Sequence, residues 1–128
     1  MNMNEIIKKE EQNHGTIYLY VDKEHCIAYE FSAYMLAQIF PSLELKREVV
    51  LEVGNVLFVI QLSFKSIIEL FTDSVAVLGH GYIRIDLDAL YSSRIIKWLN
   101  EFDILKNERD EDNSRLGTCR LGCLRLRK

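Results

Sequence analysis

The segment from residue 49 to residue 71 constrains the fold of this chain more than any other. Its sequence is VVLEVGNVLFVIQLSFKSIIELF. Two runs rich in β-branched and aromatic residues, 48–53 and 56–62, flank Gly54-Asn55. A glycine in the first loop position suits a two-residue type II′ turn. The pattern therefore predicts a β-hairpin in which Gly54 has a positive φ angle.

A helix is expected directly after this hairpin. Ser63 can accept a hydrogen bond from the free N–H groups of a first helical turn. Apolar side chains then follow at helical spacing, namely Phe64, Ile67, Ile68 and Phe71. The uncharged part of the segment is too short to cross a bilayer, which needs about 20 apolar residues. The segment therefore reads as strand, strand, helix.

Two further segments follow the same order more weakly. Residues 17–40 contain two alternating strands and a helix that Ser32 can cap. Residues 75–106 contain two short strands and a long helix that Asp88 can cap. Three hairpin-helix (ββα) units predict the α+β class, with a mainly antiparallel sheet and the helices on one face. A ferredoxin-like sheet with an extra hairpin is the nearest alternative.

The helices and the sheet should share one apolar core. We expect Trp98, Phe58 and Phe71 to be buried where the last two helices meet the strands. The 128-residue chain, 48% of it hydrophobic, has the size of one domain. These features predict a single domain that does not depend on disulfides or metal for its core.

The two ends of the chain differ from its body. Residues 1–107 are expected to form the domain, and residues 108–128 a charged, flexible tail. Within that tail, residues 108–114 carry four acids and residues 115–128 carry five bases without an acid. Residues 1–13 are polar apart from one apolar pair, so they predict a short helix or an arm. Because no apolar leader is visible, we expect a cytoplasmic protein without membrane contact.

The sequence contains no motif that defines a reaction. Cys26, Cys119 and Cys123 form no even disulfide framework, so they read as free thiols. They also supply too few ligands for structural zinc, which normally takes four. Serine-nucleophile, phosphate-loop and dinucleotide motifs are absent from the sequence. We therefore expect no catalytic residue, no metal and no cofactor.

A small enzyme is the first alternative. His80 lies between two glycines, where its imidazole could transfer protons, and Asp86 and Asp88 could hold a divalent cation. The simpler interpretation is structural: His80 fills a loop apex, Asp86 ends a strand and Asp88 caps a helix. We therefore predict that replacing His80 leaves the fold and any activity intact.

The strand alternation divides the sheet into two faces, and the face away from the expected helices is too apolar for ordinary surface. Aromatic residues and arginine are enriched at protein interfaces. We predict that this face binds a protein partner, most simply a second copy of the chain. The predicted interface residues are Tyr18, Tyr20, Leu57, Val59, Tyr82 and Arg84. The predicted function is a non-catalytic protein-interaction or regulatory module that forms a homodimer.

Two other interpretations use the same face. The N-terminal arm or the C-terminal tail could cover it, because central strands buried on both faces have the same apolar pattern. Exposed tyrosines could instead stack RNA bases. The face, however, offers Arg84 as its one base, Glu52 lies nearby, and the body of the chain is acidic. Nucleic acid is therefore an unfavoured partner.

Overall fold

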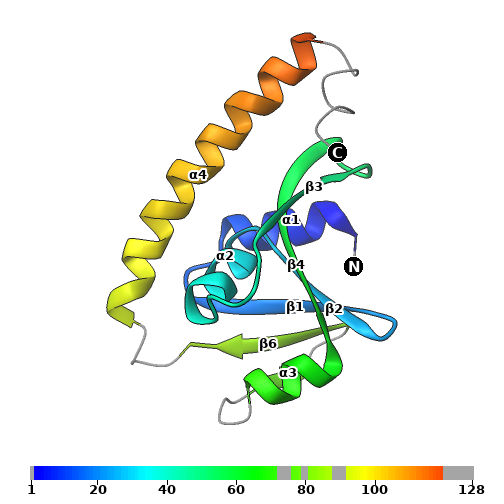
Figure 1. Ribbon diagram of the computed structural model, residues 1–128, viewed down its shortest axis with the longest axis vertical. Coiled ribbons are helices and arrows are strands. Elements are labelled where there is room, and N and C mark those ends of the chain that lie inside the picture. Colours follow the sequence, from blue (N-terminus) through cyan, green and yellow to red (C-terminus); the bar gives the residue numbers. More distant parts are fainter. Residues whose placement is uncertain (1, 72–75, 79–80, 88–91, 120–128) are drawn as a thin grey trace.

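The computed structural model describes residues 2–71, 76–78, 81–87 and 92–119. These residues form four helices and six strands, and Figure 1 shows how they are arranged. In chain order the elements are α1 (Met3–Glu11), β1 (Thr16–Asp22), β2 (His25–Tyr29), α2 (Glu30–Ile39), β3 (Lys46–Val50), β4 (Asn55–Ser63), α3 (Phe64–Leu70), β5 (Ala76–Leu78), β6 (Tyr82–Asp86) and α4 (Ser92–Cys119).

The strands form one sheet in the order β3-β4-β2-β1-β6-β5. Every neighbouring pair is antiparallel. The register places Tyr20 of β1 opposite Tyr82 of β6, and Tyr29 of β2 opposite Val59 of β4. The predicted α+β class and antiparallel sheet are thus confirmed, while the reading of the chain as three copies of one unit stays a prediction.

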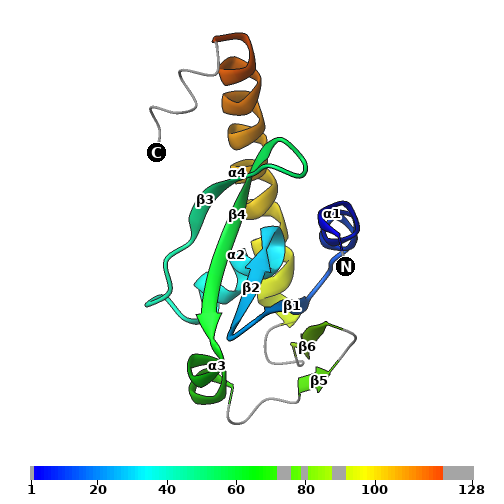
Figure 2. The same cartoon turned by 90° about the vertical axis from the view of Figure 1, so that its right-hand side faces the viewer.

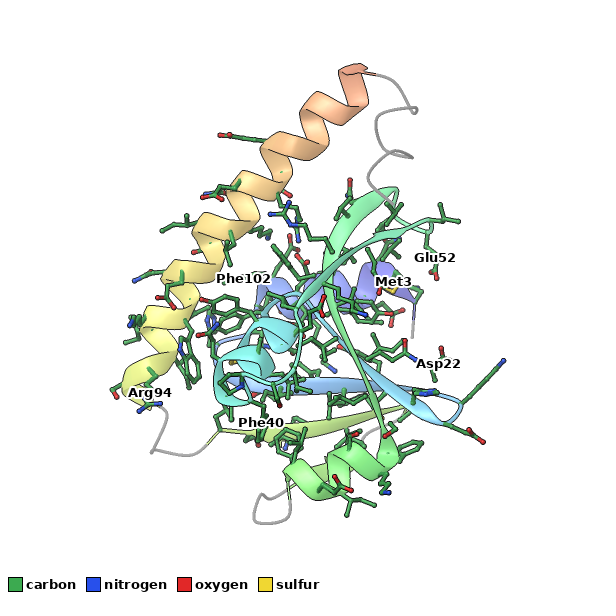
Figure 3. The ribbon with its side chains drawn as sticks, in the orientation of Figure 1. Met3, Asp22, Phe40, Glu52, Arg94 and Phe102 are labelled. Atoms are coloured by element: carbon green, nitrogen blue, oxygen red, sulfur yellow. The ribbon has the colours of Figure 1, made fainter. Side chains whose placement is uncertain are left out.

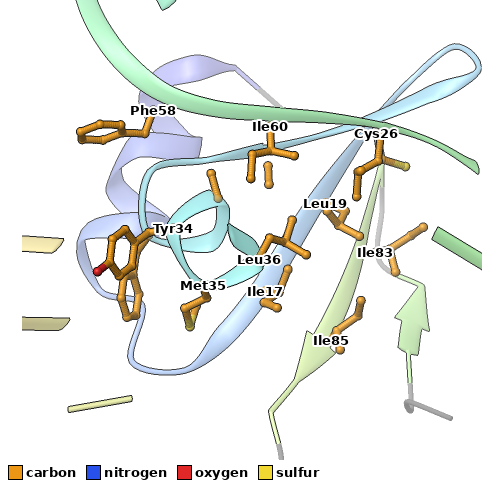
Figure 4. Close-up of a cluster of buried hydrophobic side chains, with 14 of the residues drawn as sticks. Ile17, Leu19, Cys26, Tyr34, Met35, Leu36, Phe58, Ile60, Ile83 and Ile85 are labelled. Carbon is orange, nitrogen blue, oxygen red and sulfur yellow. The ribbon is translucent and has the colours of Figure 1, made fainter. Parts of the chain in front are cut away.

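The main core lies between one face of the sheet and the helices α2, α3 and α4. Figure 4 shows Met35 and Leu36 of α2 among strand residues such as Leu19 and Ile60. Phe102 projects from α4 towards this core (Figure 3) and lies 5.7 Å from Phe58, measured between ring centroids. Alternation along the strands brings these side chains to one face, because successive residues point to opposite sides.

The expected burial of the large aromatic residues is mostly confirmed. Trp98 and Phe58 are buried, with 6% and 4% of their surfaces exposed. Phe71 is only partly buried at the edge of the core, where its ring meets Phe40 edge-on at a centroid distance of 5.2 Å. Phe71 follows the last residue of α3; within the helix Ile67 is buried, whereas Phe64 and Ile68, also expected on the apolar stripe, are exposed.

The second face of the sheet is covered by α1, which corrects the expectation that all helices lie on one face. Met3 and Ile6 of α1 form a second apolar cluster with Tyr20, Leu57 and Val59. In Figure 2, α1 is seen nearly along its axis, to the right of the strands. Residues 1–13, expected to form a short helix or an arm, thus include a helix with a buried stripe, and the alternative in which the N-terminal segment covers this face is confirmed.

Two of the predicted helix caps can be compared with the structure. Ser63 accepts a hydrogen bond from the Ser66 N–H at 3.2 Å, which confirms the cap of α3. Ser32 is not a cap, because α2 begins two residues earlier, at Glu30, with Tyr29 in the capping position. Asp88, the third predicted cap, lies outside the described residues.

The hairpin loop between β3 and β4 is longer than expected. Val50 pairs with Asn55, so residues 51–54 form a four-residue loop in place of the predicted two-residue turn. The Gly54 N–H donates to the Val50 carbonyl at 2.9 Å. Gly54 has a φ angle of 68°, so the expected positive φ is confirmed even though the turn type is not.

Helix α4 is 28 residues long and continues past residue 107, where we expected the domain to end. Its N-terminal half packs on the core, and its C-terminal part extends beyond the sheet (Figures 1 and 2). The Tyr34 hydroxyl donates to the Glu101 carboxylate at 2.9 Å, which ties α4 to α2. Among the described residues, no helix combines the length and apolar character needed to span a bilayer.

Candidate functional site

The predicted interface residues come from three strands and share one face of the sheet. We call this surface the aromatic face. Tyr18 and Tyr82 are half-buried on it, and Arg84 lies opposite Tyr18 in the register. Tyr20, Leu57 and Val59 are almost fully buried, with 3–6% of their surfaces exposed. Sequence alternation therefore placed all six residues on the right face, but α1 packs on this face and three of the six residues are buried.

Four tyrosine rings pack against one another on the aromatic face. Tyr20 is the centre of the group, at centroid distances of 6.4 Å from Tyr18, 6.1 Å from Tyr29 and 6.0 Å from Tyr82. Tyr18 and Tyr82 meet edge-on at 5.9 Å with an interplanar angle of 69°. The rings of Tyr18 and Tyr82 therefore form a corner, which we call the aromatic corner.

Lys9 of α1 places its ammonium group in this corner. The Nζ atom lies 3.8 Å from the centroid of the Tyr82 ring and 4.5 Å from that of Tyr18. A cation over an aromatic ring is attracted by the negative charge on the ring face. Met3, Ile6 and Lys9 follow each other at intervals of three residues, so one side of α1 makes both the apolar and the cationic contacts.

The Tyr20 hydroxyl is buried, and no described residue forms a hydrogen bond with it. A buried hydroxyl without a partner costs about 1–3 kcal/mol. Burial, together with the negative charge of Glu10, raises the pKa of Tyr20 well above its usual value. The packing of α1 on the aromatic face therefore includes one unfavourable group.

A buried polar network joins the end of α1 to the start of α2. The Glu10 carboxylate accepts hydrogen bonds from the Ser32 N–H at 2.9 Å, the Ser32 hydroxyl at 2.6 Å and the Asn13 amide at 3.2 Å. Ser32 is completely buried, and its hydroxyl oxygen also accepts the Tyr18 N–H at 3.0 Å. Ser32, which we expected to cap α2, thus holds α1 and β1 together.

Asn13 fixes the short link between α1 and β1. Its side-chain oxygen accepts the N–H groups of Gly15 at 3.1 Å and Thr16 at 2.9 Å, and its amide donates to the Thr16 carbonyl at 2.6 Å. Asparagine commonly stabilises turns through such bonds to its own backbone. The direction in which the chain leaves α1 is therefore set by Asn13.

Burial raises the pKa of Glu10 to about 7, because a charged carboxylate is poorly solvated in this position. The hydrogen bonds from Ser32 and Asn13 act in the opposite direction, and the nearby negative charge of Glu30 adds to the increase. Among the described residues, no basic side chain forms an ion pair with Glu10. The buried Glu10 carboxyl group can therefore gain or lose its proton near neutral pH.

A second charged site lies at the point where β2 turns into α2. Glu30 has a φ angle of 52°, a left-handed conformation that is uncommon for a residue with a side chain. Its carboxylate accepts the Phe58 N–H at 2.9 Å and forms a buried ion pair with Arg109. These bonds hold the strained residue in place, and they connect α4 to β4.

A cavity of about 340 Å³ lies beside the Glu30–Arg109 pair. Its lining comes from α1, α2, β4 and α4 and includes Glu11, Lys106 and Asp110. The Arg109 guanidinium is already held by Glu30 and by Asp110, at 3.1 Å from the latter. Its positive charge is therefore engaged within the chain, which favours a structural role for the pair.

The alternative enzyme interpretation rests on three residues, of which His80 and Asp88 lie outside the described residues. Asp86 is exposed, accepts a hydrogen bond from the Thr16 hydroxyl at 3.1 Å and lies 3.5 Å from the Arg84 guanidinium. Within the described part of the chain, no group of His, Cys, Asp and Glu side chains is arranged to hold a metal ion.

No protein-family model, curated protein or solved structure matches this chain. Its function has to be inferred from the contacts of its own residues.

Proposed function

We propose that the protein is a non-catalytic protein-interaction module that self-associates by exchanging α1 between two copies. In this proposal the aromatic face of one copy receives α1 of the other. The observation that carries the proposal is the packing of α1 on this face. Met3 and Ile6 are buried against the face, and the Lys9 ammonium lies over the rings of Tyr18 and Tyr82. The aromatic face is thus a receptor for an amphipathic helix.

The contacts that hold α1 in place all come from the rest of the fold. A nine-residue helix is not stable by itself, because isolated helices shorter than about 12–15 residues are marginal in water. Burial of Met3 and Ile6 contributes about 1.5–3 kcal/mol each. Ordering the backbone costs about 1–2 kcal/mol for every residue, and the Tyr20 hydroxyl has no described partner. The docked position of α1 therefore depends on its contacts with the aromatic face and with Ser32, and α1 of a second copy can make the same contacts.

A second copy of the chain supplies the right helix with no new interface. Exchange of an identical element between protomers reproduces the contacts of the closed monomer and is a low-cost route to dimers. Only four residues, 12–15, join α1 to β1. Exchange requires this link to extend, which opens the turn that Asn13 holds through the N–H groups of Gly15 and Thr16.

Sedimentation velocity at micromolar concentration tests the proposal with a matched pair of variants. Ile6→Glu places a charge on the buried side of α1, whereas Asn4→Glu adds the same charge at an exposed position of the same helix. We expect the wild type and Asn4→Glu to sediment as dimers and Ile6→Glu as a monomer. A dimer that persists in Ile6→Glu would locate the interface elsewhere, and a monomeric wild type would refute self-association.

A further inference from the structure

We propose that Glu10, Asn13 and Ser32 form a latch that holds α1 on the aromatic face at acidic pH and loosens it as the pH rises to neutral. The latch acts on the helix whose exchange we propose above, and its effect on self-association rests on that proposal. Its effect on the docking of α1 does not, because docking can be measured in a monomer as well as in a dimer.

The geometry places the only buried carboxylate of α1 at the hinge of the helix. Glu10 is 5% exposed and lies in the last turn before the link at residues 12–15. When α1 leaves the face, its three donors on Ser32 and Asn13 are lost and the carboxylate enters water. Docking of α1 and protonation of Glu10 are therefore coupled.

The other charged and titratable groups around Glu10 do not replace it as the switch. From α2, Glu30 adds negative charge but is paired with Arg109 of α4. The tyrosines that face α1 from the strands have pKa values raised by burial and stay neutral up to high pH, namely Tyr18 and Tyr20 of β1 and Tyr29 of β2. On α1 itself, Lys9 is held over two rings and Glu11 is exposed. His14 is exposed in the link between α1 and β1.

The direction of the pH effect follows from the two protonation equilibria of Glu10. The docked state holds its proton up to a pKa of about 7, whereas the undocked carboxyl has the ordinary value of 4.5. The contribution of Glu10 protonation to the docking free energy of α1 is thus complete below about pH 4.5. It is lost progressively as the pH rises to about 7. Between pH 5 and pH 8 the opening constant of α1 should therefore rise about tenfold or more.

Amide hydrogen exchange of the full chain measures this opening. The exchange rates of residues 7–11 are corrected for the intrinsic effect of pH and compared with those of residues 17–20 in β1, which report global unfolding. In the wild type we expect α1 to lose protection relative to β1 between pH 5 and pH 8. In Glu10→Gln, which resembles the protonated acid, the opening constant should stay within about threefold over the same range.

Two control variants separate the latch from other titrating groups. Glu11→Gln and His14→Gln should keep the pH response of the wild type, because both side chains are exposed. A response that disappears in His14→Gln would assign the effect to the imidazole and overturn the latch. A ¹³C titration of the wild-type Glu10 carboxyl gives an independent reading if a variant fails to fold: a midpoint near 7 supports the latch, and one near 4.5 contradicts it.

Sedimentation at the same two pH values distinguishes the latch from self-association. If α1 opening depends on pH while the protein is a monomer throughout, the latch stands and the proposed exchange fails. If the protein is a dimer at both pH values and α1 opening is flat, the latch fails and the exchange stands.

Discussion

Glu30 and Arg109, separated by 79 positions in the sequence, form an ion pair in which both side chains are more than nine-tenths buried. The guanidinium also lies over the Phe58 ring, with a Cζ-to-centroid distance of 5.0 Å. One residue late in α4 is therefore fixed to the turn between β2 and α2 and to β4. Residues beyond Arg109 continue the same helix, so this pair sets the direction in which the end of α4 projects.

Breaking this pair should be costly. Arg109→Met leaves the Glu30 carboxylate buried without its cation, and we expect a loss of about 3–5 kcal/mol in the free energy of unfolding. The double variant Glu30→Gln/Arg109→Met should recover most of that loss, because Gln keeps an oxygen for the Phe58 N–H. Denaturant titration measures both, with the exposed Lys97→Met on the same helix as control. A single variant as stable as Lys97→Met would show that the pair contributes little.

The loop at residues 51–54 offers a test of backbone strain without side-chain contacts. A Cβ atom at Gly54 would meet nothing within 4 Å, so the φ angle of 68° is the sole cost of a substitution. We expect Gly54→Ala to lower the stability by about 1–2 kcal/mol, and Gly54→Asn by less, since asparagine tolerates this conformation. Equal thermal midpoints for the wild type and Gly54→Ala would exclude this conformation of the loop.

The aromatic corner should select a cation on the helix that it receives. Lys9→Met removes the charge over Tyr18 and Tyr82, which we expect to cost about 0.5–1 kcal/mol. By hydrogen exchange, the opening constant of α1 should rise about two- to fivefold. Lys9→Arg should restore the wild-type value, and Lys8→Met changes the charge equally at an exposed position. Identical effects of Lys8→Met and Lys9→Met would mean that the corner does not recognise the ammonium group.

Much of the sheet could be predicted because strand alternation is a local property. The period of two assigned Ile17 and Leu19 to the main core and Tyr18 and Tyr20 to the other face, as the two apolar clusters confirm. The cap at Ser63 was also readable, since it depends on a residue three positions away. Such features follow from short stretches of sequence without knowledge of the tertiary fold.

The cover of the aromatic face could not be predicted in the same way. Residues 1–13 contain few apolar side chains, and the spacing of Met3, Ile6 and Glu10 becomes informative only when the receiving face is known. Glu10 read as part of a charged run, yet it is buried by tertiary contacts with Ser32. The one available signal was spacing: Glu10 lies four residues after Ile6, on the side of the helix that carries the buried residues.

The site at Glu30 was missed for a different reason. The left-handed φ of Glu30 starts α2 two residues before the apparent serine cap, and nothing in the local sequence requires this conformation. Its partner Arg109 lay in a segment that read as a tail because of its charges. A long-range ion pair of this kind leaves no periodic pattern in a single sequence.

The most direct test of the account is an isotope-filtered nuclear Overhauser experiment on a mixture of ¹³C-labelled and unlabelled chains that have been unfolded and refolded together. Exchange of α1 predicts contacts between the Ile6 methyl groups of one copy and the methyl groups of Leu57 and Val59 of the other. Ile6 contacts confined to its own chain would contradict the exchange, whether the sample sediments as a dimer or as a monomer.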